Sequence, residues 1–452
     1  MRLPADPRAE TRRILALAWP VMLTSLNWTL LHITDVVVVG LTGTDQVAAL
    51  GASRALTYIG IVVALGWMSG VIVMVSRADG AKDAPRTARV LHDGLIAGVL
   101  LGLLSGGILF FFAQPLLIGV GVEPGIAPSA ARVVEVMALA YPFQLANIVA
   151  AFFLEGVSKP RRVMVVNLSV LPLNAILAWA LSGGHWGLPA LGAVGAAAAT
   201  AIASAVGAAA MLTAAWTLPD GRARGVGRWR LPATAPSLAG IAALLSFGAV
   251  PAIASGLELA GFSILIALST QLGEPVAHAF QIVFSVHNVT FGVALGLGSA
   301  AGVRVGNAIG EGLPDQAAGR ALIAVLLAVA ALGLQAALIV ALAAPIVDAF
   351  PAIVAVHAIG VAMLMAWAPF IVFDGVQVVL VYALRSMGDQ VAAGFNSILA
   401  YFIVTGGLGW WLFVTGWGYM GLVWASVAGM VVAAASNGAR LAWISRRTRP
   451  QS

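Results

Sequence analysis

The sequence predicts an all-α integral membrane protein, with twelve transmembrane helices in two six-helix lobes related by an internal repeat. Three observations predict this fold class: the composition, the alternation of apolar stretches with charged clusters, and landmarks that recur in the two halves. Of the 452 residues, 61% are hydrophobic and 9% are charged, whereas soluble proteins carry about 45–50% apolar and about 25% charged residues. A single water-soluble core could not bury so much apolar surface in a chain of this length.

The composition also excludes several classes of protein. Because the chain has no cysteine, it has no disulfides, thiolate nucleophiles or cysteine metal sites. The 24 basic residues exceed the 18 acidic ones by only a modest margin, and they lie between apolar stretches, so they indicate membrane topology and no nucleic-acid partner. The first 13 residues are polar and the apolar segment after them is too long for a signal-peptide core. We therefore expect an uncleaved, cytoplasmic N-terminus.

The predicted spans follow from segmenting the chain at charged clusters and at Pro and Gly breaks, since a helix needs about 20 apolar residues to cross the hydrocarbon layer. The twelve spans cover residues 14–40, 46–76, 91–113, 128–155, 163–182, 188–215, 237–270, 276–303, 321–343, 354–384, 392–415 and 419–443. With the N-terminus inside, all Lys and Arg residues except Arg54 and Arg132 lie on the cytoplasmic side. Both chain ends are therefore expected in the cytoplasm.

The two halves of the chain share landmarks at one offset. Asn167 corresponds to Asn396, and Trp186 to Trp417, at a separation of about 230 residues. An even number of helices per half keeps both halves in the same orientation, and internal symmetry is typical of secondary transporters. The predicted parts are an N-terminal lobe (1–215), a basic cytoplasmic linker (216–236), a C-terminal lobe (237–443) and a cytoplasmic tail (444–452).

Three carboxylic acids lie at membrane depth, where ionisable groups are costly and mark functional sites. Asp35 is in the first span, Glu258 in the seventh and Asp374 in the tenth, and none has a basic residue within two turns of its own helix. Each is a candidate for carrying a coupling proton, and Glu258 and Asp374 are candidates for binding Na⁺. The alternative is a carboxyl group satisfied by a neighbouring helix.

Further polar and aromatic side chains are candidates for lining a substrate cavity. These are Asn174, Gln281, Asn288, Gln377, Phe262, Phe284 and Trp28. The alternative is that the amides join helices by hydrogen bonds and that the aromatic rings belong to the core. His287 and His357 are interpreted as ordinary polar contacts, and the glycine stripe around Gly296 as close helix packing.

Several passages together resemble the multidrug and toxic compound extrusion (MATE) family across essentially the whole chain. They are residues 34–40 (TDVVVVG), 153–160 (FLEGVSKP), 186–195 (WGLPALGAVG), 304–311 (RVGNAIGE) and 374–385 (DGVQVVLVYALR). The sequence is similar to the NorM-type branch, which keeps acids in the second half as Glu258 and Asp374 do here. The DinF-type aspartate four residues after an asparagine is missing, because Asn174 is followed by Ala178. A tyrosine that often precedes the span-10 aspartate by four positions is Phe370 here.

The resemblance implies multidrug efflux by H⁺- or Na⁺-coupled antiport of organic cationic and lipophilic compounds across the bacterial inner membrane. It implies that the protein needs no cofactor and is not an enzyme. Its partners would be small-molecule cations and membrane lipids, and we expect a monomer. The alternative is a related flippase for lipids or lipid-linked precursors. Such a polyanionic substrate favours intramembrane Arg or Lys, and the sequence places no basic residue deep in a predicted span.

Two other classes of protein fit the sequence less well. An enzyme would need a nucleophile–base pair or metal ligands at suitable spacing, and the sequence lacks both. A passive channel would not need repeated halves with buried acids.

Overall fold

The computed structural model describes residues 3–447, apart from the side chains of Trp28 and Arg447. The side chain of Trp28, one of the predicted cavity residues, is therefore not described. Residues 448–452 of the predicted tail also lie outside the described residues. Within residues 3–447 the chain forms helices and connecting loops, with no β-strand.

The helices account for the predicted spans. They are α1 (Pro7–Gly40), α2 (Thr44–Gly80), α3 (Ala84–Gly119), α4 (Ala127–Ala138), α5 (Tyr141–Gly156), α6 (Pro160–Gly183), α7 (Ala193–Trp216), α8 (Gly221–Arg224), α9 (Leu238–Gln271), α10 (Glu274–Gly310), α11 (Pro314–Ala341), α12 (Ala343–Asp348), α13 (Val354–Trp367), α14 (Ile371–Met387), α15 (Gln390–Ser397), α16 (Gly409–Val414) and α17 (Gly418–Arg447). Short 3₁₀ turns cover His185–Gly187 and Ala368–Phe370, and Ile398–Leu408 is π-helical. Eleven helical segments of the described chain are long and apolar enough to span a membrane, and α4 with α5 makes a twelfth, bent by 48°. The predicted twelve-helix fold is confirmed.

Proline marks the helix starts and two of the breaks. It occupies one of the first two positions in α3, α6, α10 and α11, where its missing N–H would have no partner within the helix. At the start of α3, Asp83 also accepts a hydrogen bond from the backbone N–H of Arg86 at 3.0 Å. Pro142 follows the bend between α4 and α5, and Pro369 lies in the 3₁₀ turn that separates α13 from α14. This second break comes directly before the segment that carries Asp374.

The chain divides into two compact units by its internal packing. One unit comprises the described parts of residues 1–22 and 253–452, and the other comprises residues 23–252. The division falls inside two helices, because α1 and α9 each contribute one part to each unit. The loop 216–236, which the sequence predicts as a linker between lobes, lies wholly within the second unit.

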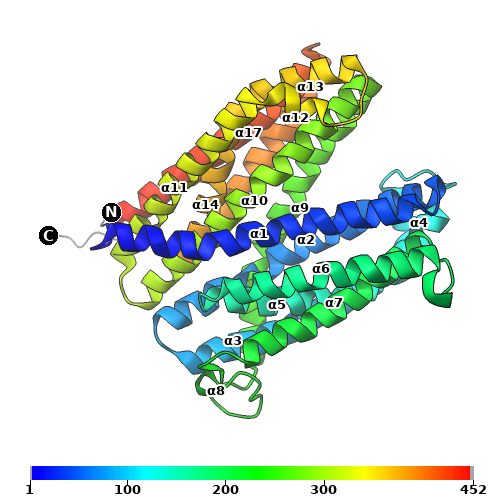
Figure 1. The fold of residues 1–452 in the computed structure, drawn as a ribbon. Helices are drawn as coiled ribbons and strands as arrows, with labels where there is room; N and C mark the ends of the chain where they lie inside the picture. Colours follow the sequence, from blue (N-terminus) through cyan, green and yellow to red (C-terminus); the bar gives the residue numbers. More distant parts are fainter. Residues whose placement is uncertain (1–2, 448–452) are drawn as a thin grey trace. The chain divides into compact units, whose positions relative to one another are not determined.

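The first unit is built around α10, which packs on α11, α13 and α14 (Figure 1). Small residues permit these close approaches. A Cβ at Gly296 would lie 2.8 Å from the carbonyl oxygen of Ala18 on α1, and one at Gly298 would lie 2.8 Å from the Cγ1 of Val378 on α14. These distances are shorter than van der Waals contact, so glycine is required where the helices meet. The glycine stripe is therefore a packing surface.

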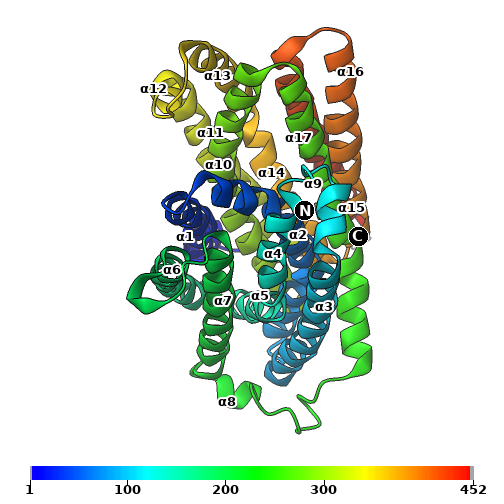
Figure 2. The ribbon, with the colours of Figure 1, turned by 90° about the vertical axis from the view of Figure 1, so that its right-hand side faces the viewer.

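The second unit pairs α6 with α7 and packs α3 against α2 and α5, and both views show α6 beside α7 (Figures 1 and 2). Here too, small residues set the distance between helices. A Cβ at Gly102 would lie 2.6 Å from the Cα of Pro142. The polar loop 216–236 is held on the start of α3, where buried His92 makes a hydrogen bond to the Thr234 carbonyl at 2.8 Å and its ring stacks on Trp229 at 4.2 Å.

A buried ion pair fastens the first turns of α1 within the first unit. Arg304 on α10 donates to both oxygens of Glu10, from Nε at 2.6 Å and from Nη2 at 2.8 Å, and Nη1 donates to Asn307 at 3.1 Å. Glu10 is 3% exposed and Arg304 is 8% exposed. The arginine of the predicted RVGNAIGE passage thus holds the amino-terminal part of α1 in place.

Breaking this pair should destabilise the protein strongly. Glu10→Ala leaves the Arg304 guanidinium buried without its counter-charge, and we expect a loss of about 3–5 kcal/mol. The measurement is the midpoint of thermal unfolding of the purified protein in detergent. The double variant Glu10→Leu/Arg304→Met removes both charges and should recover much of the loss. An unchanged midpoint for Glu10→Ala would show that the pair contributes nothing.

Candidate functional site

The centre of the first unit is the carboxyl group of Asp374, which is 4% exposed. The Tyr401 hydroxyl donates to Oδ1 at 3.1 Å, and the His287 ring nitrogen Nε2 lies 3.3 Å from Oδ2. Both carboxylate oxygens therefore have a partner, as a buried charge requires. Three helical segments converge to build this arrangement: α10, α14 and the π-helical segment.

Two local irregularities bring these side chains together. Asp374 is in the first turn of α14, just after the Pro369 break. Tyr401 is fully buried in the π-helical segment Ile398–Leu408, and such segments often occur at functional sites because they re-aim side chains relative to a regular helix. The sequence contains the residues for both features, but only the packing of α14 against the π-helical segment joins them.

Two more of the predicted polar residues lie beside Asp374. Glu258 on α9 is half-buried, and it is close enough to Asp374 and to Arg385 of α14 for both charges to act on it. Gln377, one turn after Asp374, is 3% exposed, and its side chain is within hydrogen-bonding reach of the Tyr401 hydroxyl. Oxygen atoms from Glu258, Asp374, Gln377 and Tyr401 thus gather in one region of the first unit.

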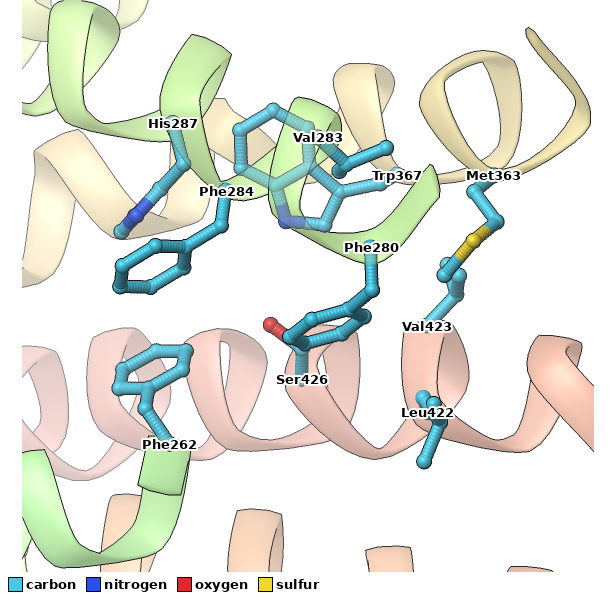
Figure 3. A pocket seen from close by; sticks show the side chains of 10 residues that line it. All are labelled: Phe262, Phe280, Val283, Phe284, His287, Met363, Trp367, Leu422, Val423 and Ser426. Atoms are coloured by element: carbon cyan, nitrogen blue, oxygen red, sulfur yellow. The ribbon is translucent and has the colours of Figure 1, made fainter. Parts of the chain in front are cut away.

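An aromatic hollow adjoins this region, and His287 is one of the residues that line it (Figure 3). It is lined by Phe262 of α9; Phe280, Val283, Phe284 and His287 of α10; Met363 and Trp367 of α13; and Leu422, Val423 and Ser426 of α17. Figure 3 shows the predicted cavity residues Phe262 and Phe284 facing each other, with ring centroids 6.0 Å apart. The wall of the hollow is mainly apolar and carries a few polar atoms, those of His287, Trp367 and Ser426.

Gln281 and Asn288 do not line this hollow. Both are exposed on α10, whereas His287, the neighbour of Asn288, faces inward and is only 9% exposed. Neither amide is among the residues that line the hollow. The structure therefore brings Gln377, Phe262 and Phe284 to the first-unit site but not these two amides.

In the second unit, Asp35 of α1 has its own polar partners. Asn174 of α6 donates to Oδ1 of Asp35 at 3.1 Å, and Thr200 of α7 donates to the side-chain Oδ1 of Asn174 at 3.3 Å. Asn174 is 1% exposed, whereas Asp35 and Thr200 are half-buried. Ala178, at the position where a second aspartate would mark the DinF-type branch, is fully buried.

Asp35 also has a cation near it, although not from its own helix. Arg54 of α2 hydrogen-bonds to the ring and backbone of His32, one turn before Asp35, and its charge acts on Asp35. Along the sequence each acid can be compared only with basic residues of its own helix, and Arg54 lies on another helix. The packing of α1 on α2 is what supplies it.

Tyr401 and His287 belong to the site but are not predicted from the sequence. A tyrosine hydroxyl was expected at position 370, four residues before Asp374, but the chain has a phenylalanine there, which packs against Phe373 and Trp424. The hydroxyl comes instead from Tyr401, which lies 27 residues after Asp374 and on another helical segment. A tyrosine in a predicted span was the available signal, but nothing in the sequence connects it to Asp374.

Within the described residues no three His, Asp or Glu side chains are grouped as a metal site would require. The architecture is that of a polytopic membrane transporter, since it combines duplicated helical halves with carboxyl groups at membrane depth.

Comparison with known proteins places this architecture in a family. The sequence model of the MatE family matches twice, at residues 20–180 and 251–411, and two matches of equal length agree with the internal repeat. The chain is 30% identical over 429 residues to a probable multidrug resistance protein NorM of Burkholderia pseudomallei, covering 93% of this chain and 90% of that protein. It is 28% identical over 446 residues to the multidrug resistance protein PmpM of Pseudomonas aeruginosa, covering 97% and 93% of the two chains. The chain belongs to the MatE family, the multidrug and toxic compound extrusion transporters.

The solved structures agree on the fold. A MATE transporter of Vibrio cholerae superposes with a TM-score of 0.87 at 17% identity, covering 98% of each chain. Transporters of this family are not enzymes, and they work without a cofactor. The predicted family and membrane class are therefore confirmed.

The hydroxyl of Tyr401 should contribute measurably to the stability of the first unit. Tyr401→Phe removes one of the two partners of the buried Asp374 carboxylate, and a hydrogen bond to a charged group contributes about 1.5–3 kcal/mol. We expect a lower midpoint of thermal unfolding in detergent. The control is Tyr419→Phe in the same unit, because Tyr419 has no carboxylate partner in the described chain. Equal midpoints for the two variants would contradict the assigned role of Tyr401.

Proposed function

We propose that the chain is a multidrug efflux transporter that exports organic cationic and lipophilic compounds in exchange for H⁺ or Na⁺. The observation that carries this proposal is the buried carboxylate of Asp374, held by Tyr401 and His287 beside an aromatic hollow. The names of the relatives NorM and PmpM, both multidrug resistance proteins, support it.

The proposed coupling uses one negative site for two kinds of cation. A carboxylate beside aromatic rings attracts a lipophilic cation through its charge and through the ring faces. A proton or Na⁺ arriving from outside neutralises the carboxylate, weakens its hold on the drug and favours release outward. Each net charge moved inward gains about 2.3 kcal/mol per 100 mV of membrane potential.

We assign the coupling ion to Asp374 and Glu258, and the second-unit group of Asp35 and Asn174 to coupling or to a second ion. If Na⁺ is the ion, the oxygen atoms gathered around Asp374 are suitable ligands for a hard cation. The Tyr401 hydroxyl then takes the place of the one that Phe370 lacks. The two six-helix lobes of residues 1–215 and 237–443, a monomeric state and cytoplasmic termini belong to this proposal as well.

A flippase for lipid-linked precursors is the second candidate, and one observation favours it. Arg54 lies within the membrane-spanning helix α2, where a polyanionic headgroup would need a cation. Arg54 contacts His32 and acts on Asp35, so a carboxylate already offsets its charge. We therefore favour cation export.

Efflux of ethidium from proteoliposomes tests the proposal, with a pH gradient and a Na⁺ gradient imposed separately. We expect one gradient to drive export by the wild type, and Asp374→Asn to reduce the initial rate at least tenfold, since the amide cannot bind the coupling ion. Asp348→Asn is the matched control: it removes a carboxylate of the same unit whose side chain is 61% exposed.

Each outcome has a definite meaning. Export driven by the pH gradient alone identifies H⁺ as the ion, and export that requires Na⁺ identifies Na⁺. Equal rates for Asp374→Asn and the wild type would exclude Asp374 from coupling. If neither gradient drives export of any organic cation, the flippase becomes the better explanation.

Labelling of single cysteines tests the proposed orientation, which the absence of native cysteine makes straightforward. Ala223 is exposed in the short helix α8 and Glu123 is exposed in the loop between α3 and α4, and the proposed topology places the two on opposite sides of the membrane. In intact cells, a membrane-impermeant maleimide should label Glu123→Cys but reach Ala223→Cys only after permeabilisation. The reverse pattern would invert the topology.

A further inference from the structure

We propose that the loop 216–236 binds the headgroup of an anionic phospholipid through the exposed side chains of Arg222, Arg228 and Arg230. The loop joins α7 to α9 and lies wholly within the second unit. The inference goes beyond the proposed function, because it concerns a lipid that stays bound to the protein and not a compound that is exported. It uses the proposed topology only to place this lipid in the cytoplasmic leaflet.

The charge of the loop is not balanced within the protein. The loop contains four arginines and a single aspartate. Arg224 has acidic partners, since it pairs with Asp79 of α2 at 2.8 Å and with Asp220 at 2.6 Å. The other three arginines are exposed, and none of their side chains has a hydrogen bond or an ion pair with the described part of the chain. These three charges are therefore available to an anionic partner.

The first turns of α3 hold the backbone of the loop. The side chain of Arg89 donates to two backbone carbonyl oxygens of the loop, at 2.8 and 3.1 Å. The ring of His92 accepts a hydrogen bond from the backbone N–H of Gly227 at 3.2 Å, and Asp93 accepts one from the backbone N–H of Ser237 at 2.7 Å. Because the loop backbone is fixed before a ligand binds, less conformational freedom is lost on binding.

The loop lies at the predicted boundary of the membrane. It leaves the end of α7 and enters the start of α9 (Figure 2), and both helices are long and apolar enough to span a membrane. It is bound to α3 around His92, and the predicted third span begins at residue 91. Helix α3 has 36 residues, about 54 Å along its length, so it extends beyond a hydrocarbon layer of about 30 Å. We therefore place the exposed arginines at the level of the lipid headgroups.

Apolar side chains beside the arginines favour a lipid over a soluble acidic partner. Trp229 lies between two of the exposed arginines in the sequence. Its ring stacks on His92 with the ring centroids 4.2 Å apart, yet Trp229 is 38% exposed, and Leu231 is 43% exposed. Tryptophan is enriched at membrane–water interfaces, where its ring lies among the headgroups. A guanidinium group matches the geometry of a phosphate, so the loop offers both charge and apolar contact to an anionic phospholipid.

Native mass spectrometry of the full-length protein in detergent measures the binding. The first probe is dioleoylphosphatidylglycerol. Dioleoylphosphatidylcholine has the same acyl chains but no net charge, and glycerol phosphate has the anionic group without the chains. Each arginine near an anionic lipid surface increases the affinity about fivefold. For the wild type we therefore expect phosphatidylglycerol to bind about tenfold more tightly than phosphatidylcholine, or better, and glycerol phosphate to bind weakly.

Three triple variants test the assignment. Replacing the three exposed arginines of the loop with glutamine should lower the preference for phosphatidylglycerol to about one, whereas replacing them with lysine keeps the charges and should retain most of it. The matched control is Arg8→Gln/Arg12→Gln/Arg13→Gln, which removes the same charge from exposed positions near the start of α1 and should behave as the wild type. All these positions are exposed, so the variants should fold, and the midpoint of thermal unfolding without lipid checks this.

Loss of the preference in the glutamine variant of the loop, with retention in the lysine variant and the control, would support the inference. Equal binding of both phospholipids by the wild type, an unchanged preference in the glutamine variant, or an equal loss in the control would overturn it. Tight binding of glycerol phosphate would also overturn it, since the loop would then hold a soluble anion. Because the experiment measures no transport, a failure of efflux contradicts the proposed function and leaves the lipid site standing.

Discussion

The hydrocarbon layer offers no partner to a backbone N–H or C=O group, and the rest of this structure follows from that constraint. Every membrane-crossing segment must satisfy its backbone internally, so the described chain is a set of helices joined by short loops. The break around Pro369 and the π-helical segment Ile398–Leu408 depart from the regular α-helix, and both position groups at the carboxyl group of Asp374.

The same constraint explains how Asp374 is held. In water its carboxylate would be hydrated, but inside the first unit it needs donors from the protein. Tyr401 and His287 supply them, and His287 is also one of the residues that line the aromatic hollow. In the proposed antiport, the carboxylate assigned to the coupling ion and the wall assigned to the drug share one side chain, that of His287.

Helix α1 makes a polar attachment in each compact unit. Near its amino end, Glu10 is paired with Arg304 in the first unit, and near its carboxyl end, Asp35 is hydrogen-bonded to Asn174 in the second. Both attachments use acids that cannot lose their partners cheaply.

The sequence by itself determined the membrane class, the twelve helices and the three deep acids, because hydropathy and charge act locally along a chain and a helix spanning a membrane has a required length. Proline alone did not determine the breaks, because Pro142 and Pro369 lie at breaks whereas Pro20, Pro172 and Pro251 lie within continuous helices. Only the tertiary structure decided which partners those acids have. Tyr401, His287 and Arg54 lie on other helices than the acids they serve, and the packing of helices in space, which no local pattern encodes, brings them together.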